Sequence, residues 1–443
     1  MKRLRIIGGV AAGMSAAAKA RRINPELDIK VFTDNAYISY SSCGLPYYIG
    51  GIVKSPNDLI ARTTEHFAQQ GTKVHTMTRA LEIKPDVGLI ILEDLTTHEL
   101  FTEEYDCLII ATGARAVIPS LDGINLRGIF TLRDIQDSQA IKAYLQEYQS
   151  TRAVVIGAGY IGLEMVENLR AHGCQVRMIE KSPQILPVMD QDMAQVVASY
   201  MESQGIEVLT DSAVTAFRGD DRVREVVVGD NSFPADIVIL SIGVLPNSEI
   251  AGRAGIELGA GNAIRVNRQM ATNLPGIYAA GDCATVHHII SDREVYLPMG
   301  TTANKQGRIA GENAAGGSTF FKGVLGTGIS RIMELEISRT GLCEQECRNL
   351  GIDFITRTIK SRTMVPFFPE SGRIRVKILV ETHSRRLLGG QIVGYPGSGK
   401  RIDTIAAALT LNCRIDDLIN MDLAYAPPFS PLWDPVLTAI NKF

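Results

Sequence analysis

Residues 153–162 read AVVIGAGYIG, an apolar run that leads into the pattern Gly-x-Gly-x-x-Gly. In this pattern the first glycine permits a tight turn, the second lets the backbone approach a pyrophosphate, and the third lets a helix pack closely on the strand. The N-terminus of that helix then faces the negative charge of the phosphates. The sequence therefore predicts a dinucleotide site at this turn, formed by Gly157, Gly159, Tyr160, Ile161 and Gly162.

The next expected strand, residues 176–180, ends in a carboxylate, Glu180. A carboxylate at this position can accept a hydrogen bond from the ribose 2′-hydroxyl, which favours NADH. Lys181 follows directly and could pair with a 2′-phosphate, so NADPH stays open. A further apolar segment, 237–243, closes the unit, and we add its last residue, Gly243, to the predicted NAD site.

The chain opens with a second unit of the same kind, although its glycine turn is less regular. Residues 4–9 form the expected strand, and residues 8–13 read GGVAAG, with Val10 in place of the second glycine. The following strand ends before Thr33 and Asp34, either of which could bind the ribose of a dinucleotide.

Two later segments indicate that this first site holds FAD. Residues 108–113 and 276–282 are apolar strands that end in glycine, and Asp282 supplies a carboxylate for the ribityl hydroxyls. We expect the second segment, and a helix near 302–315, to return to the first domain. The predicted FAD site comprises Gly8, Gly9, Ala12, Gly13, Thr33, Asp34, Ser42, Thr112, Gly113, Gly281 and Asp282.

The pattern changes from about residue 323 onward. Apolar residues at 374, 376, 378 and 380 alternate with mostly charged ones, which predicts a strand with one mostly solvated face in an antiparallel sheet. A helix is expected at 402–411, before a proline-rich segment at 424–431.

These elements predict an α/β fold with two Rossmann-like dinucleotide-binding domains and a C-terminal α+β domain. Residues 1–115 and 245–322 would form the FAD-binding domain, residues 116–244 the NAD(P)-binding domain, and residues 323–443 the C-terminal domain. Right-handed crossovers between consecutive strands then imply parallel sheets in the first two domains.

Composition restricts the class of protein and its partners. The 443 residues carry 45 Lys and Arg against 48 Asp and Glu, a net charge of −3 that gives no reason to expect nucleic acid. With 45% hydrophobic and 21% charged residues, a membrane partner is not expected either. Seven scattered cysteines lack the pairing of a disulfide framework or a zinc site, so we expect a cytoplasmic protein without a metal. The start of the chain imitates a signal peptide, but a nucleotide-binding strand, turn and helix explain it better.

One cysteine stands out by its surroundings. Residues 40–47 read YSSCGLPY, just after the second strand of the first unit and close to the expected dinucleotide. A cysteine near a helix N-terminus and a flavin ring would have a lowered pKa and react as the thiolate. Cys43 is therefore the candidate redox residue, against the alternative of a buried structural cysteine.

These motifs, together with residues 278–282, 401–403 and 424–428, give the chain a resemblance that spans essentially its full length. It resembles the single-cysteine branch of the flavin disulfide reductases, in particular the coenzyme A-disulfide reductases, with NADH oxidases and peroxidases nearby. Two-cysteine relatives carry a second cysteine five residues after the first, where this chain has Tyr48. The resemblance thus implies that Cys43 cycles between a thiolate and a mixed disulfide.

The resemblance also bears on the oxidant. Ala11 stands where the peroxidases and oxidases of this branch carry a histidine, which favours a disulfide, persulfide or polysulfide over peroxide or oxygen. An NADH oxidase or peroxidase that forms a Cys43 sulfenic acid is the alternative. A flavoprotein whose redox state controls binding to a partner protein is a third interpretation.

Coenzyme A is expected beside the first helix and the cysteine loop, as substrate or as bound cofactor. The contacts that the resemblance implies are Ser15, Lys19, Arg22, Ser39, Ser42 and His75. Lys19 and Arg22 would meet phosphates. The alternative for these two cations is a solvated basic end of the helix.

The resemblance implies a homodimer in which Tyr425 reaches the cysteine of the other subunit and donates a proton there. The C-terminal domain would then be the dimerisation domain. Where coenzyme A-disulfide reductases have Tyr-Tyr-Pro, this chain has Phe367-Phe368-Pro369, which removes a hydroxyl from the expected site. This difference weighs against coenzyme A disulfide as the exclusive substrate.

Overall fold

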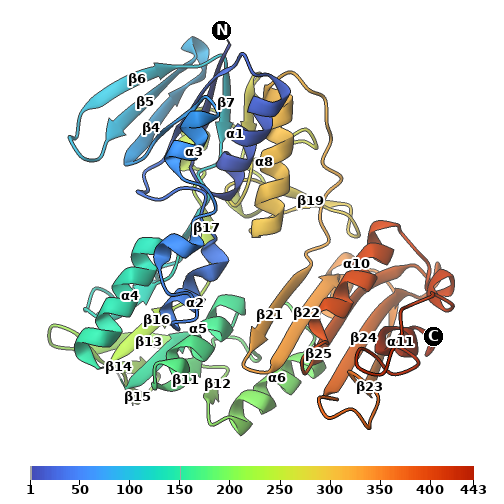
Figure 1. Ribbon diagram of the computed structural model, residues 1–443. Coiled ribbons are helices and arrows are strands. Elements are labelled where there is room, and N and C mark those ends of the chain that lie inside the picture. Colours follow the sequence, from blue (N-terminus) through green and yellow to red (C-terminus); the bar gives the residue numbers. More distant parts are fainter. Residues whose placement is uncertain (1, 150) are drawn as a thin grey trace.

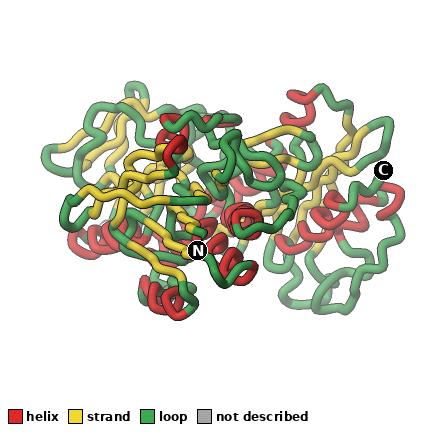
Figure 2. The backbone as a smooth tube through the Cα atoms, turned by 90° about the horizontal axis from the view of Figure 1, so that it is seen from above, coloured by secondary structure: helices red, strands yellow, loops and turns green. Residues whose placement is uncertain are grey.

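The computed structural model describes residues 2–149 and 151–443 and has the predicted α/β architecture, with two dinucleotide-binding domains and a C-terminal domain (Figure 1). Viewed from above, the domain that holds the C-terminus forms a lobe at one end of the molecule (Figure 2). No helix in these two stretches has both the length and the apolar character needed to cross a bilayer.

The first domain is built on a parallel five-stranded sheet of order β18-β7-β1-β2-β3. Its strands are β1 (Arg3–Ile7), β2 (Asp28–Phe32), β3 (Thr72–His75), β7 (Cys107–Ile110) and β18 (Ile277–Ala279). Helices α1 (Ala11–Ile23) and α8 (Gly300–Ala314) pack together on one face, with α3 (Thr64–Gln69) beside β3. The other face is covered by a meander of β4 (Thr78–Lys84), β5 (Leu89–Asp94) and β6 (Leu100–Glu104). The segment after residue 276 thus returns to the first sheet, as predicted.

The second domain repeats the design with a parallel sheet of order β12-β11-β10-β16-β9. Its strands are β9 (Ile129–Thr131), β10 (Arg152–Ile156), β11 (Gln175–Ile179), β12 (Glu207–Leu209) and β16 (Ile237–Leu240). The helices are α4 (Ile135–Tyr148), α5 (Tyr160–Ala171) and α6 (Gln191–Ser203), and the small sheet is β13 (Val214–Gly219), β14 (Val223–Val228) and β15 (Asn231–Pro234). Strands β8 (Ala114–Ala116) and β17 (Val244–Pro246) pair antiparallel where the chain passes between the two domains.

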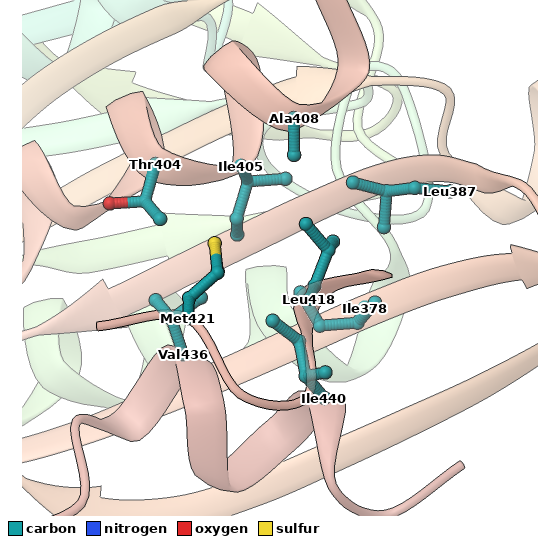
Figure 3. Close-up of a pocket in the computed structure, with 9 residues that line it drawn as sticks. All are labelled: Ile378, Leu387, Thr404, Ile405, Ala408, Leu418, Met421, Val436 and Ile440. Atoms are coloured by element: carbon teal, nitrogen blue, oxygen red, sulfur yellow. The ribbon is translucent and has the colours of Figure 1, made fainter. Parts of the chain in front are cut away.

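The C-terminal domain contains an antiparallel sheet of order β21-β22-β25-β24-β23. The strands are β21 (Gly328–Ile332), β22 (Leu335–Gly341), β23 (Phe354–Arg362), β24 (Arg373–Glu381) and β25 (Leu387–Gly394). Helix α6 of the second domain packs on β25, and α10 (Ile402–Thr410) and α11 (Pro435–Ile440) cover β22 to β25 from the other side. Apolar side chains such as Ile405 and Val436 line the space under these two helices (Figure 3). This space is therefore part of the hydrophobic core of the domain.

The prediction that one face of the strand at 373–381 is mostly solvated is wrong for the central part of the strand. Lys377 is only 3% exposed, and Leu379 is fully buried. The Lys377 ammonium contacts carboxylates of Asp190 at 3.1 Å, Asp192 at 2.7 Å and Glu344 at 2.6 Å. Asp190 and Asp192 lie at the start of α6, so the second domain covers this face of β24 and supplies the charge that makes burial of the lysine tolerable.

The remaining elements connect these layers. They are α2 (Leu45–Ile49), α7 (Glu249–Arg253), α9 (Glu344–Leu350), β19 (Val286–His288) and β20 (Arg293–Val295). Helix α2 belongs to the first domain in sequence, yet it packs on α4 and α5 of the second domain, and its Leu45 and Ile49 join that domain's core. The cysteine loop that precedes α2 is thereby carried to the border between the two nucleotide-binding domains.

Candidate active site

The carboxyl ends of β1, β7 and β18 bring the first glycine turn, Thr112 and Gly281 together at one edge of the first sheet. Gly281 has a φ of +87°, and a Cβ on it would lie 2.8 Å from Cβ of Ala12. Its backbone N–H donates to Oε1 of the fully buried Gln306 at 2.9 Å. The close approach of Gly281 to α1 leaves a narrow backbone cradle of the kind that a dinucleotide needs at the helix N-terminus.

Asp282 lies in this cradle with two residues that sequence analysis missed. Its Oδ2 accepts from Nη2 of Arg133 at 2.6 Å. The hydroxyl of Tyr296 is buried and finds no hydrogen-bond partner among residues 2–149 and 151–443, and burial, followed by the charge of Asp282, raises the pKa of Tyr296. Buried polar atoms are rarely left unpaired, so this hydroxyl fits a polar ligand such as FAD. Neither Arg133 nor Tyr296 belongs to a motif, and only the fold brings them to Asp282.

The two candidates for the ribose contact lie in different surroundings. Thr33 is buried, and its side chain packs against Gly9, where an added Cβ would lie 2.8 Å from the Thr33 Cγ2. Asp34 is exposed and its carboxylate lies 3.7 Å from Nε of Arg79. Thr112 uses its hydroxyl to bind the carbonyl of Asn247 at 2.6 Å. The residues predicted to bind FAD therefore gather around the first glycine turn and Gly281, with Asp34 at their solvent edge.

The second glycine turn has the geometry that the motif predicts. Gly157 has a φ of +98°, and a Cβ on it would lie 2.5 Å from the carbonyl oxygen of Ser241. A Cβ on Gly159, in contrast, would meet no atom within 4 Å, so the backbone is open to a ligand there. Ile161 is exposed beside it, and Gly243, in the turn between β16 and β17, has a φ of +115°.

Glu180 lies at the base of this turn. One carboxylate oxygen accepts from the N–H of Ala158 at 2.7 Å, and the other accepts from the N–H of Ser182 at 2.8 Å. Each oxygen keeps a further lone pair, so the carboxylate can orient the turn and still accept from a ribose hydroxyl. Lys181 is exposed next to it.

Tyr160, the first residue of α5, lies at the border of the C-terminal domain. A Cβ on Gly328 of β21 would lie 3.1 Å from the Tyr160 hydroxyl, so the ring packs directly on that strand. The hydroxyl is buried without a partner in the described chain. The turn therefore offers an unpaired polar group, an open glycine and a helix N-terminus, which together suit a pyridine nucleotide.

Cys43 is exposed in a short 3₁₀ turn, Ser42–Gly44, directly before α2. Its loop is fixed by backbone hydrogen bonds to a neighbouring segment: Ser41 N–H donates to Leu59 at 2.9 Å, and Ala61 N–H donates to Ser39 at 2.8 Å. The sulfur is thus accessible, although its backbone is held on both sides.

The charges around Cys43 place it between the two nucleotide sites. Burial of the sulfur by neighbouring atoms raises the pKa of the thiol, and Glu164 and Asp282 raise it further, while Arg133 lowers it. Asp282 belongs to the cradle predicted to hold FAD, and Glu164 to the helix after the turn predicted to bind NAD(P)H. Within the chain itself, burial and the two carboxylates outweigh the one guanidinium and raise the pKa of Cys43, so the lowered pKa expected beside a flavin ring stays a prediction.

Glu164 was not predicted from the sequence. It lies on the inward face of α5, where burial raises its pKa to about 7, and the charge of Glu167 adds to the rise. The hydroxyl of Ser330 in β21 donates to it at 3.3 Å and opposes the shift. Its position two residues after the last glycine of the motif was the available signal, but only the fold turns this carboxylate toward Cys43.

The predicted coenzyme A contacts fall into two groups. Ser39 adjoins the first glycine turn, because its N–H donates to Gly9 at 2.8 Å, and Ser42 follows on the same loop. His75 lies at the end of β3, where its ring stacks on Phe32 with the centroids 5.1 Å apart.

The other three contacts, Ser15, Lys19 and Arg22, lie along α1. The Ser15 hydroxyl accepts from Asn304 at 2.8 Å, and Lys19 pairs with Glu312 at 2.9 Å. Arg22 is exposed, and its Nε bonds only to a carbonyl of its own helix, at 3.1 Å. Arg22 is therefore the residue of this group whose charge is best placed for an external phosphate.

Tyr425 lies in the segment between α10 and α11, the two helices that cover the C-terminal sheet on the side opposite α6 (Figure 1). Its side chain is 45% exposed, and that of Phe367, in the loop between β23 and β24, is 77% exposed. Within residues 2–149 and 151–443 no hydrogen bond joins Tyr425 to the Cys43 loop of the same subunit. Both side chains face outward, as residues that act on a second subunit would.

Comparisons with known proteins agree with this geometry. The family model described as pyridine nucleotide-disulphide oxidoreductase matches residues 2–307, and that described as its dimerisation domain matches residues 330–435. A Pyrococcus horikoshii protein named NAD(P)H coenzyme A polysulfide/persulfide reductase is 37% identical over 100% of this chain and 99% of its own. A Methanocaldococcus jannaschii protein named NADH oxidase is 36% identical over 98% of this chain and 97% of its own. The crystal structure of reduced Bacillus anthracis CoADR-RHD superposes with a TM-score of 0.97 at 34% identity, over 100% of this chain and 80% of that one.

Proposed function

Because the chain belongs to the pyridine nucleotide-disulphide oxidoreductase family, we propose that it uses NAD(P)H and FAD to reduce a small disulfide, persulfide or polysulfide through Cys43. The observation that carries the proposal is the position of this exposed sulfur within electrostatic reach of both Asp282 and Glu164. A coenzyme A-linked substrate is the preferred form, supported by the name of the Pyrococcus relative and by the exposed Arg22 on α1.

The residues of the chain would divide the work as follows. The turn 157–162 and Glu180 bind the pyridine nucleotide, and the cradle of Gly8, Gly281 and Asp282 binds FAD. FAD, when bound, supplies the two-electron transfer from the nicotinamide to sulfur. The backbone is packed so closely at Gly157 and Gly281 that an added Cβ would collide with Ser241 or Ala12, which would keep both turns in fixed positions relative to the Cys43 loop.

Cys43 would act as the nucleophile. Its thiolate attacks one sulfur of RS–SR′, forms a Cys43–S–SR bond and releases R′S⁻, which takes up a proton. Two electrons and one further proton then cleave the mixed disulfide to the Cys43 thiolate and RSH. The overall reaction is NAD(P)H + H⁺ + RSSR′ → NAD(P)⁺ + RSH + R′SH.

Two groups can supply the protons for the leaving thiolates. Glu164 is close to half-protonated at neutral pH because burial raises its pKa to about 7. In the homodimer that the dimerisation domain suggests, the partner subunit's Tyr425 would be the second donor. The exposed position of Tyr425 supports this role.

The test is anaerobic NADH oxidation by the holoenzyme with coenzyme A disulfide, polysulfide or glutathione disulfide, and in parallel with peroxide or oxygen. We expect turnover with the first two, and its loss in Cys43→Ser but not in the matched control Cys413→Ser, whose thiol is partly exposed in the C-terminal domain. A strong preference for oxygen would instead support the oxidase function, which the name of the Methanocaldococcus relative favours. Disulfide turnover that survives in Cys43→Ser would rule out the proposal.

A further inference from the structure

Two loops of the C-terminal domain expose large aromatic side chains without a helix or strand to hold them. The first connects β23 to β24 and exposes Phe367; the second runs from Tyr425 to Asp434 and exposes Phe429 (74%) and Trp433 (56%). If the domain pairs with a second subunit, these side chains form the surface that the subunit presents. The shape of that surface then depends on the distance between the two loops, which a contact within the domain must fix.

Arg401, at the start of α10, lies between them. Its Nη2 donates to the carbonyl of Thr363, in the first loop, at 3.0 Å and to the carbonyl of Phe429, in the second, at 2.7 Å. Its Nε donates to Oδ2 of Asp434 at 2.8 Å, and its Nη1 donates to the carbonyl of Gly397. One guanidinium thus ties both loops to the same helix.

The contact is largely shielded from solvent, and four of the five guanidinium N–H groups donate in it. The side chains of Arg401 and Asp434 are each 12% exposed, so each would leave an unpaired charge if the other were removed. Asp434 is itself fixed, because Oδ1 accepts from Val436 N–H at 2.8 Å at the start of α11 and Oδ2 accepts from the Ser430 hydroxyl at 3.2 Å. A lysine could not reproduce this arrangement, since one ammonium cannot direct donors along the three directions of a planar guanidinium.

We propose that Arg401 is a positioning residue that sets the distance between the Tyr425–Asp434 loop and the Phe367 loop. It thereby shapes the wall that one subunit presents to Cys43 of the other. The inference rests on the proposed function, because it assigns Arg401 to binding of the disulfide substrate. The proposal involves no contact between Arg401 and NAD(P)H or FAD. Only the reaction of Cys43 with the disulfide substrate therefore depends on Arg401.

The first experiment compares holoenzyme carrying Arg401→Lys with the wild type and with Arg385→Lys, a control whose arginine pairs with Asp416 on the surface of the same domain. In Arg401→Lys we expect KM for coenzyme A disulfide to rise about tenfold or more, with KM for NADH and the rate of anaerobic FAD reduction by NADH within about twofold of wild type. An unchanged disulfide KM in a folded dimer, or an equal effect on the NADH half-reaction, would overturn the proposal.

A second variant covers the case in which Arg401→Lys does not fold. Ser430→Ala removes one hydrogen bond to Asp434 and leaves the arginine in place, so it should raise the same KM by about two- to threefold. Combining Tyr425→Phe with Arg401→Lys, or with Ser430→Ala, measures how strongly each pair of residues is coupled. We expect the effects of the two substitutions on KM to be non-additive, because both act through the same loop. Unchanged KM in Ser430→Ala, or additive effects with Tyr425→Phe, contradicts the proposal. If the wild type turns over no disulfide at all, the proposed function fails instead.

Discussion

The reactivity of Cys43 depends on the charges of the few residues around it, Glu164 among them. Cys43 is an exposed residue, but burial of its sulfur by neighbouring atoms, followed by the charges of Glu164 and Asp282, raises the pKa of the thiol, while Arg133 lowers it. A nucleophile in such surroundings needs a compensating group, and the electron-deficient ring of a bound flavin can provide one. Sequence analysis identified the sulfur from its neighbours in the chain. It did not anticipate that Glu164 and Asp282 raise the pKa of the thiol, because both are distant in sequence and reach it only through the fold.

Replacing Glu164 with glutamine should make Cys43 easier to ionise. Glu164 carries its negative charge mainly above pH 7, since burial raises its pKa to about 7, and that charge raises the pKa of the thiol. Glu164→Gln should therefore shift the pH profile for alkylation of Cys43 by iodoacetamide to lower pH, measured on holoenzyme reduced anaerobically with NADH. The control is Glu334→Gln, an exposed residue of the hairpin between β21 and β22. A profile that stays in place, or moves to higher pH, would show that Glu164 does not act on the thiol.

At the scale of single elements, the sequence was most informative where backbone geometry restricts the residue type. The strand-turn-helix units at β1–α1 and β10–α5 were predictable because glycine spacing and apolar runs determine them locally. The burial of the second face of β24 was not predictable. Alternation of apolar and polar residues shows that a strand has two different faces, but not which other domain covers each face. The start of α6, almost two hundred residues earlier in the chain, supplies the carboxylates around Lys377.

This buried cluster joins the second domain to the C-terminal domain. Lys377→Met would leave the buried carboxylate of Asp190 without its ammonium partner, at a cost of about 3–5 kcal/mol in the free energy of unfolding. Urea unfolding followed by circular dichroism measures this loss. Lys360→Met, on the exposed face of neighbouring β23, should change the same free energy by less than about 0.5 kcal/mol. Equal stabilities for the two variants would mean that the cluster contributes nothing to the domain contact.

At the scale of the whole molecule, the proposed reaction uses residues of two subunits. The α2 helix that follows Cys43 packs with the second domain, whereas Tyr425 and Phe367 are exposed in loops of the C-terminal domain. The sequence predicted the dimer only through a resemblance. The structure adds a physical reason, because exposed aromatic side chains of this size are typical of a surface that a partner covers.

Mixing subunits tests whether Tyr425 acts in trans. Coexpressed Cys43→Ser and Tyr425→Phe chains form a mixed dimer with one intact site if the tyrosine serves the other subunit's cysteine, and none if it serves its own. Each parent dimer should have low disulfide turnover, and the coexpressed mixture should recover about a quarter of wild-type activity, because half the dimers are mixed and each has one working site. Activity of the mixture no higher than the average of the two parents would exclude the trans arrangement.

The central claim is that Cys43 carries the substrate as a mixed disulfide. The most direct measurement is mass spectrometry of the Cys43 peptide after NADH-reduced holoenzyme is mixed anaerobically with coenzyme A disulfide and quenched with acid. We predict one coenzyme A on Cys43, removed when excess NADH is added before the quench. Coenzyme A on another cysteine, or a Cys43 peptide that never gains mass, would contradict the account.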